Sequence, residues 1–386
     1  IAPDERRAAA VEWGLDMLSV MKEPTVLTPL TSKSVAKIAV GSSQIFFTTQ
    51  TGQMFSYGLS GEADDEKEGE KERDKEKVLA VTRLPFQSAV QHLSASKYHA
   101  AAVTEDGLLY TWGRGSFGRL GHGSDVDRLE PTQVMAFAGM RVTLVECGEC
   151  HTVCTTGDHR TYAWGMGHHG QLGNGSLNTV KEPEEIITLR DRAISAISCG
   201  RFHTCVLAAG HLWVWGRGRD GQLGLEDCNV QAEPIMLTLP AAAVAVSSTP
   251  SASTSASTKP SGQGNFMPIT AIACGDVHTL AVRANGEVWS WGRGANGRLG
   301  HGSTSDVFTP RNIEYFAETG RRMIDVAAGK NFSLALSDGG EVFAWGNGED
   351  GQLGSPVKES VHPKLVEKLK NYRIGTISAG DVYICA

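Results

Sequence analysis

The segment ITAIACGDVHTLAVRANGEVWSWGRGANGRLGHG, residues 269–302, decides the fold. Apolar residues alternate over 269–274 and 278–283, which predicts two strands joined by a glycine-containing turn. Asn285-Gly286 is typical of a two-residue hairpin turn, and residues 287–291 predict a third strand. A glycine-rich loop and a short outer strand at 310–313 complete a unit of four antiparallel strands.

This unit recurs along the chain. Its marker is an aromatic residue followed by glycine, at positions 13, 57, 112, 164, 215, 291 and 345, with spacings of 44, 55, 52, 51, 76 and 54. Counting from Trp345 through the C-terminus to Trp13 again gives 54. Because an unpaired edge strand is a liability, we expect the two ends to pair. The repeats predict an all-β fold, a seven-bladed β-propeller of four-stranded antiparallel blades, with the last blade closed by both termini.

Residues 1–386 therefore read as one propeller with two insertions. Residues 62–77 form a charged loop with nine acids and five bases. Residues 241–264 are rich in Ala, Ser and Thr, and removing these 24 residues returns the spacing of 76 to 52. We expect the second insertion to be disordered, because such polar low-complexity sequence buries little apolar surface.

The composition excludes several classes of protein. The net charge is −7, so no overall basic field marks a nucleic-acid binder, and no apolar run is long enough to cross a membrane. Eight cysteines in 386 residues do not form a disulfide framework, which favours a reducing compartment. We expect a cytoplasmic location, with the nucleus as the alternative. The chain begins with Ile1, and we expect it to be a domain of a longer protein.

Three units carry a family resemblance: GECHTVCTT…YAWGMGHHGQLGNG, GRFHTCVLA…WVWGRGRDGQLG and GDVHTLAVR…WSWGRGANGRLGHG. They resemble the repeats of the regulator of chromosome condensation family, over essentially the whole chain. The resemblance implies the propeller fold. It also suggests a module of a larger protein such as a giant HECT-type ubiquitin ligase, but the fold hosts unrelated activities.

Two motifs suggest cofactors but fit the repeat frame better. Five G-x-G-x-x-G copies, beginning at Gly113, Gly165, Gly216, Gly292 and Gly346, have no helical pattern behind them. They indicate turn glycines rather than a phosphate site, which needs a helix N-terminus. Cys147, Cys150, His151 and Cys154 match haem-attachment or zinc spacing. Because His151 aligns with a histidine in other units, we expect each such histidine to fix its own turn. We predict no cofactor and no metal.

One face of the propeller gathers charged residues. The turn between the first two strands of each unit and the glycine-rich loop after the third emerge on the same side. The bases expected there are Lys97, Arg114, Arg119, Arg201, Arg217, Arg219, Arg293, Arg298 and Lys330, and the acids are Glu149, Asp220, Asp276, Glu349, Asp350 and Asp381. Nine bases against six acids leave +3 on this face. Solvated loop charge is one interpretation. The other is a docking face, because arginine suits carboxylate recognition.

Three functions remain open. The first is a protein-interaction propeller of a larger protein, whose partner carries an acidic surface. The second, implied by the resemblance, is nucleotide exchange on a Ran-type small GTPase, for which the family uses acids on adjacent blades. The acids concerned lie in the turns between first and second strands. Here Lys330 separates the turn acids Asp276 and Asp381, and Lys97 and Arg201 flank Glu149, so no two adjacent blades both offer an acid in these turns. The third, chromatin docking, is disfavoured by an N-terminus without excess basic charge. No catalytic constellation is evident, so the sequence favours a domain that is not itself an enzyme.

Overall fold

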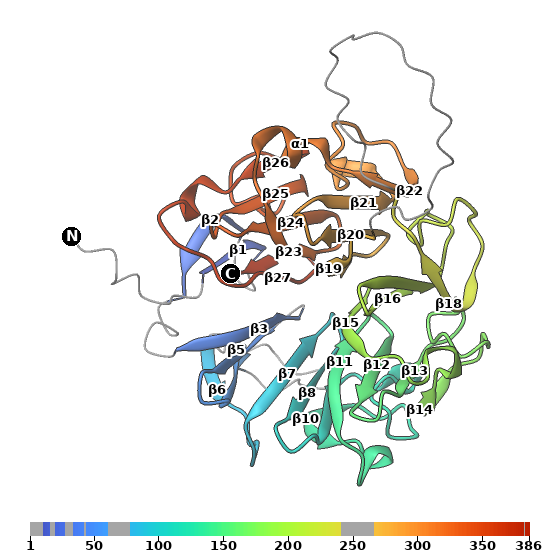
Figure 1. The fold of residues 1–386 in the computed structure, drawn as a ribbon. Helices are drawn as coiled ribbons and strands as arrows, with labels where there is room; N and C mark the ends of the chain where they lie inside the picture. Colours follow the sequence, from blue (N-terminus) through green and yellow to red (C-terminus); the bar gives the residue numbers. More distant parts are fainter. Residues whose placement is uncertain are drawn as a thin grey trace, which may run out of the picture.

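A computed structural model describes residues 11–15, 20–27, 34–41, 44–60, 78–240, 266–381 and 383–386. Its described strands form seven four-stranded antiparallel sheets arranged around a common centre (Figure 1). Both insertions predicted from the sequence, 62–77 and 241–264, lie outside the described residues.

Six sheets are each built from four consecutive strands, and we number them blades 1 to 6 in chain order. Blade 1 contains β3 (Val35–Val40), β4 (Gln44–Thr49), β5 (Met54–Ser60) and β6 (Val78–Arg83), and blade 2 contains β7 (Val90–Ala95), β8 (His99–Thr104), β9 (Leu109–Gly113) and β10 (Arg128–Gln133). Blade 3 contains β11 (Val142–Cys147), β12 (His151–Thr156), β13 (Thr161–Gly165) and β14 (Val180–Glu185), and blade 4 contains β15 (Ile194–Cys199), β16 (His203–Ala208), β17 (His211–Gly216) and β18 (Gln231–Leu237). Blade 5 contains β19 (Ile269–Cys274), β20 (His278–Arg283), β21 (Val288–Gly292) and β22 (Val307–Asn312), and blade 6 contains β23 (Met323–Ala328), β24 (Phe332–Ser337), β25 (Val342–Asn347) and β26 (Glu359–Leu365).

The remaining sheet, the closing blade, combines both ends of the chain. It contains β27 (Ser378–Ala379) and β28 (Tyr383–Cys385) from the C-terminal end, and β1 (Val11–Leu15) and β2 (Val20–Val26) from the N-terminal end. β1 pairs with β28, with Trp13 opposite Ile384. The prediction of a seven-bladed propeller therefore needs correction in the number of complete blades. Six blades are complete and continuous in sequence, whereas the closing blade is a composite whose two C-terminal strands have only two and three residues.

Helical structure is short and lies between strands. The helix α1 (Glu314–Thr319) connects blades 5 and 6, and 3-10 turns η2 (Ser116–Gly118), η3 (Met135–Phe137), η4 (Ile187–Leu189), η5 (Ala295–Gly297) and η6 (Glu367–Leu369) occupy loops. None of the helices in the described ranges has the length and apolarity needed to cross a membrane. The predicted strands 269–274 and 278–283 coincide with β19 and β20, whereas the outer strand expected at 310–313 is β22 and begins at Val307.

The core consists of apolar layers between neighbouring blades. Each layer packs residues of one blade against the next, as where Val153 of blade 3 contacts the cluster around Trp215 of blade 4. The first strands of the blades, β3, β7, β11, β15, β19, β23 and β27, line the centre of the ring (Figure 1). The turns that follow these strands therefore meet at one mouth of the central channel.

Candidate functional site

A repeated hydrogen-bond node joins the blades behind this mouth. In blade 3, His151 begins β12, and its Nε2 lies 2.9 Å from Thr204 Oγ1 of blade 4. Thr204 Oγ1 donates its hydrogen to the carbonyl of Gln171 in the glycine-rich loop of blade 3, so it accepts from the imidazole N–H. The same arrangement links His99 to Thr152, His203 to Thr279 and His278 to Ser333. The expectation that each histidine fixes only its own turn was incomplete, because these side chains bridge to the next blade.

The same loop carbonyls also accept hydrogen bonds from the tryptophans of the aromatic–Gly pairs. Trp164 Nε1 donates to Arg119 O, Trp215 Nε1 to Gln171 O, and Trp291 Nε1 to Gln222 O, each at 2.9 Å. All three indole rings are fully buried. One backbone oxygen therefore receives a hydroxyl and an indole from the following blade, which places each glycine-rich loop firmly against its neighbour.

The glycine of each aromatic–Gly pair is required by geometry. Gly165 has φ +108°, and a Cβ there would lie 2.5 Å from Cys150 O and 2.7 Å from His151 Cα. Equivalent close approaches occur at Gly113, Gly216, Gly292 and Gly346, whose φ values lie between 106° and 111°. The G-x-G-x-x-G copies therefore serve the turn, as predicted from the absence of a following helix.

Charges alternate around the channel mouth. In these turns a basic and an acidic residue alternate from blade 2 through the closing blade: Lys97, which follows Ser96, and then Glu149, Arg201, Asp276, Lys330 and Asp381, which each follow a glycine. Arg201 Nε lies 2.9 Å from Glu149 Oε2, and Lys97 Nζ lies 4.0 Å from Asp381 Oδ2. Three bases and three acids therefore balance one another in the described turns of the mouth.

Below these turns lies a cavity of about 230 Å³ lined by the first strands. Burial, together with the nearby Asp381 and Glu149 carboxylates, raises the pKa of Asp276 to about 6. Glu146, on the cavity wall, has its pKa raised to about 8 by burial. Within the described residues Asp276 forms no ion pair, so burial and neighbouring carboxylates outweigh the attraction of Arg201 and Lys330.

Two arginines of the predicted docking face are structural. Arg119 is 3% exposed, and its guanidinium donates to Ser116 O and to Glu149 O of the next blade. Arg298 is 4% exposed and donates in the same way to Ala295 O and Lys330 O. Burial lowers the pKa of Arg298 to about 10. Neither side chain is available to a partner, a fact the sequence could have indicated because both align with Gln171 and Gln222.

The other predicted bases fall into two groups. Three are paired: Lys97 with Asp381, Arg201 with Glu149, and Arg217 Nη2 with Asp220 Oδ2 at 3.1 Å. By contrast, four exposed bases form no ion pair with any described residue: Arg114, Arg219, Arg293 and Lys330. They belong to blades 2, 4, 5 and 6 and lie around the mouth. We call these four residues the basic arc.

Aromatic rings lie against arginines of this face on two blades, and one of these arginines, Arg114, belongs to the basic arc. Tyr98 follows Lys97, and the Arg114 guanidinium lies 5.5 Å from its ring centroid. Phe202 similarly lies below Arg201, at 5.0 Å. Phe117, which is 41% exposed, adds an apolar surface on blade 2, where the Arg119 guanidinium lies 5.8 Å from its ring centroid. These rings are not among the residues predicted from the sequence for this face, although Tyr98 and Phe202 occupy the same repeat position.

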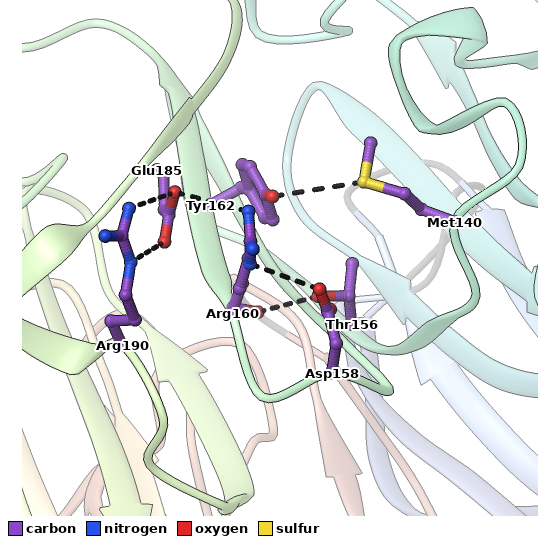
Figure 2. Close-up of polar contacts among 7 residues, drawn as sticks. All are labelled: Met140, Thr156, Asp158, Arg160, Tyr162, Glu185 and Arg190. Atoms are coloured by element: carbon purple, nitrogen blue, oxygen red, sulfur yellow. Dashed lines mark hydrogen bonds and ion pairs between the residues drawn. The ribbon is translucent and has the colours of Figure 1, made fainter.

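The opposite face of blade 3 shows a different treatment of charge (Figure 2). Glu185 receives two hydrogen bonds from Arg190, at 2.7 and 2.8 Å, and Arg160 Nε lies 3.1 Å from Asp158 Oδ2. Tyr162 OH points to Met140 Sδ at 3.9 Å. All four charges drawn there are paired, unlike those of the basic arc.

The geometry defines a class of protein: a β-propeller whose blades are locked by histidine–hydroxyl–carbonyl nodes. The RCC1-like domain family matches residues 7–255, and regulator of chromosome condensation repeats match residues 285–336 and 339–386. The chain belongs to this RCC1-like family.

Known proteins similar to this chain include "E3 ubiquitin-protein ligase HERC2" of Mus musculus, 29% identical over 98% of this chain and 8% of that protein. "Ultraviolet-B receptor UVR8" of Arabidopsis thaliana is 32% identical over 75% of this chain and 60% of that protein. The chain thus spans less than a tenth of the HERC2 relatives it matches. Two solved structures share the fold: human WBSCR16, with TM-score 0.78, 19% identity and 98% of each chain covered, and Prp20p of Saccharomyces cerevisiae, with TM-score 0.77, 21% identity, and 99% of this chain and 91% of that one covered.

Proposed function

We propose that this propeller is a protein-docking module of a larger protein, and that the basic arc binds an acidic segment of the partner. The observation that carries the proposal is the exposure of Arg114, Arg219, Arg293 and Lys330 without ion pairs among the described residues. Exposed cations on one face attract and orient an acidic surface. The similarity to a region of a ubiquitin-protein ligase supports placing such a module within a longer chain.

The arrangement of acids on the loops limits where the partner contacts the face. Glu349 and Asp350 belong to the glycine-rich loop of blade 6, beside Lys330. Blades 2, 4 and 5 carry Arg114, Arg219 and Arg293, and the acid of the blade 4 loop, Asp220, is already paired. The partner's carboxylates are therefore expected over blades 2 to 5, where Tyr98 and Phe202 offer aromatic contacts.

The test is titration of a fluorescent peptide rich in Asp and Glu, followed by anisotropy at low and high salt. Arg114→Ser, Arg219→Ser and Arg293→Ser should each weaken binding by up to about fivefold, because exposed charge pairs contribute about 0–1 kcal/mol. Arg141→Ser is the matched control, since Arg141 is also exposed but precedes β11 and lies at the opposite end of that strand. Equal losses for Arg141→Ser and Arg293→Ser, or binding that does not weaken with salt, would refute the docking face.

A further inference from the structure

The boundary between blades 4 and 5 contains a side-chain cluster that the docking function does not use. His203 and Cys205 on β16 and Cys274 on β19 place their potential ligand atoms within 4.8 Å of one another. His203 and Cys205 are 0% exposed and Cys274 is 8% exposed. The Nδ1 atom of His203 is buried and has no hydrogen-bond partner among the described residues.

The cluster is a departure from the repeat. At each boundary, the node histidine, the residue two positions later and the residue before the next turn glycine occupy the same places. Between blades 2 and 3 they are His99, Ala101 and Cys147, and between blades 3 and 4 they are His151, Val153 and Cys199. Only between blades 4 and 5, of these described boundaries, do all three bear ligand atoms, because Cys205 replaces Ala or Val.

We propose that His203, Cys205 and Cys274 bind one zinc ion that fastens blade 4 to blade 5. Two thiolates and an imidazole are ligands that zinc prefers, and in a tetrahedral zinc site such atoms lie about 3.5–3.8 Å apart. Two thiolates neutralise Zn²⁺, which permits burial in an apolar layer. Binding breaks two S–H bonds and forms two Zn–S bonds, so it releases two protons to solvent and strengthens as pH rises.

The surroundings provide access and a reason for such a link. Cys274 and Ser198 line the central cavity, which gives an ion a route to the cluster and can supply water as a further ligand. The connection from β18 to β19 runs over residues 238–268, the longest between consecutive numbered blades. A long connection restricts the relative positions of two blades less than a short one. An added bond at this boundary therefore stabilises the ring where the covalent connection between blades is longest.

The test measures the metal content of the purified chain after exposure to zinc, and the sulfur-to-metal charge-transfer absorption after titration with Cd²⁺. We expect about one equivalent for the wild type and almost none for Cys205→Ala. The neighbouring boundaries already hold Ala101 and Val153 at this position, so Cys205→Ala and Cys205→Val both keep a side chain that the fold accepts. Cys228→Ser, at an exposed cysteine outside the cluster, should keep the full equivalent.

A gain-of-site variant makes the test sharper. Val153→Cys completes the set with His151 and Cys199 and should raise binding to about two equivalents. A chelator should lower the melting temperature of the wild type and leave that of Cys205→Ala unchanged. The proposal is overturned if wild type and Cys205→Ala bind equal amounts of zinc and Cd²⁺, or if Cys228→Ser alone abolishes binding.

Discussion

His151 Nε2 and Thr204 Oγ1 lie 2.9 Å apart across the boundary between blades 3 and 4, and both are completely buried. The threonine hydroxyl passes its own hydrogen to Gln171 O at 3.1 Å. The pair therefore connects β12 of blade 3 and β16 of blade 4 with the glycine-rich loop of blade 3. Its recurrence at four boundaries explains why histidine and threonine stand side by side in HTV, HTC and HTL.

The first prediction concerns this node. Thr204→Val removes the hydroxyl while keeping the shape, and leaves the His151 N–H without an acceptor. A buried donor left unsatisfied costs about 1–3 kcal/mol, so the free energy of unfolding in urea should fall by that amount. Thr270→Val is the control, since Thr270 is exposed and lies near the start of β19. This substitution should change the free energy of unfolding by less than about 0.5 kcal/mol. Equal effects of the two variants would contradict the role assigned to the node.

The second prediction is a loss of stability in mild acid. Burial lowers the pKa of His151 to about 3, with the His203 and Arg119 charges acting in the same direction, and burial lowers the pKa of His92 and His301 to about 4. A histidine whose pKa is lower in the folded state stabilises fully above its unfolded pKa of about 6.5 and progressively less as pH falls. Each such histidine should lower the free energy of unfolding by about 2 kcal/mol as the pH falls from 6.5 to 5.

Carboxyl groups whose pKa is raised in the folded state have the opposite effect on stability. Glu146, with pKa about 8, and Asp276 and Asp325, with pKa about 6, favour the folded state in acid, and that contribution is lost as pH rises through those values. The histidine contribution is isolated by comparing wild type with His151→Gln, which stays neutral. The variant should lose less stability than wild type between pH 6.5 and 5. Parallel curves would show that His151 titrates normally.

The third prediction concerns ring closure. Deleting residues 1–20 removes β1, which pairs with β28 through Glu12, Trp13 and Gly14. The three-residue strand β28 then becomes an exposed edge. We expect the melting temperature to fall by many degrees, measured by circular dichroism, together with concentration-dependent aggregation. Deleting residues 1–10 leaves those pairs intact and serves as the control; a similar fall in both truncations would argue against closure as the cause.

The fourth prediction separates two demands on glycine. Gly139 and Gly165 both have positive φ, +82° and +108°, but an added Cβ at Gly139 meets nothing within 4 Å. Gly139→Ala should cost about 1–2 kcal/mol from the backbone conformation alone. Gly165→Ala should cost more, on the order of 3 kcal/mol, because its Cβ also meets Cys150 O. Thermal or urea unfolding measures both, and equal costs would show that the loop yields without strain.

The fifth prediction addresses nucleotide exchange. Among the turns at the mouth, that of Lys330 stands between those of Asp276 and Asp381, so no two adjacent blades both present an acid in this turn. We expect no acceleration of labelled GDP release from a Ran-type GTPase mixed with the purified chain. Acceleration of about a hundredfold or more, lost in Asp276→Ala, would make exchange the better interpretation; such a factor corresponds to roughly 2.7 kcal/mol of transition-state stabilisation.

Much of the fold could be predicted because it is written in local patterns that repeat. Alternation over 269–274 and 278–283 located β19 and β20, and the recurring aromatic–Gly pair located the third strands. The lengths of the strands in each sheet could not be predicted from these local patterns. The two strands β27 and β28 have only two and three residues, and β28 pairs with β1, which lies at the other end of the sequence.

The sequence by itself determined the repeat, the class of fold, the family and the face on which charge collects. Only the tertiary structure decided which charges remain available: it buried Arg119 and Arg298 against carbonyl groups, paired Arg201 with Glu149, and left Arg114 and Arg293 exposed. It also brought Cys205 next to Cys274 from the following blade. The physical reason is that strand periodicity depends on neighbouring residues, whereas burial, ion pairing and ligand geometry depend on side chains that meet only when the ring has closed.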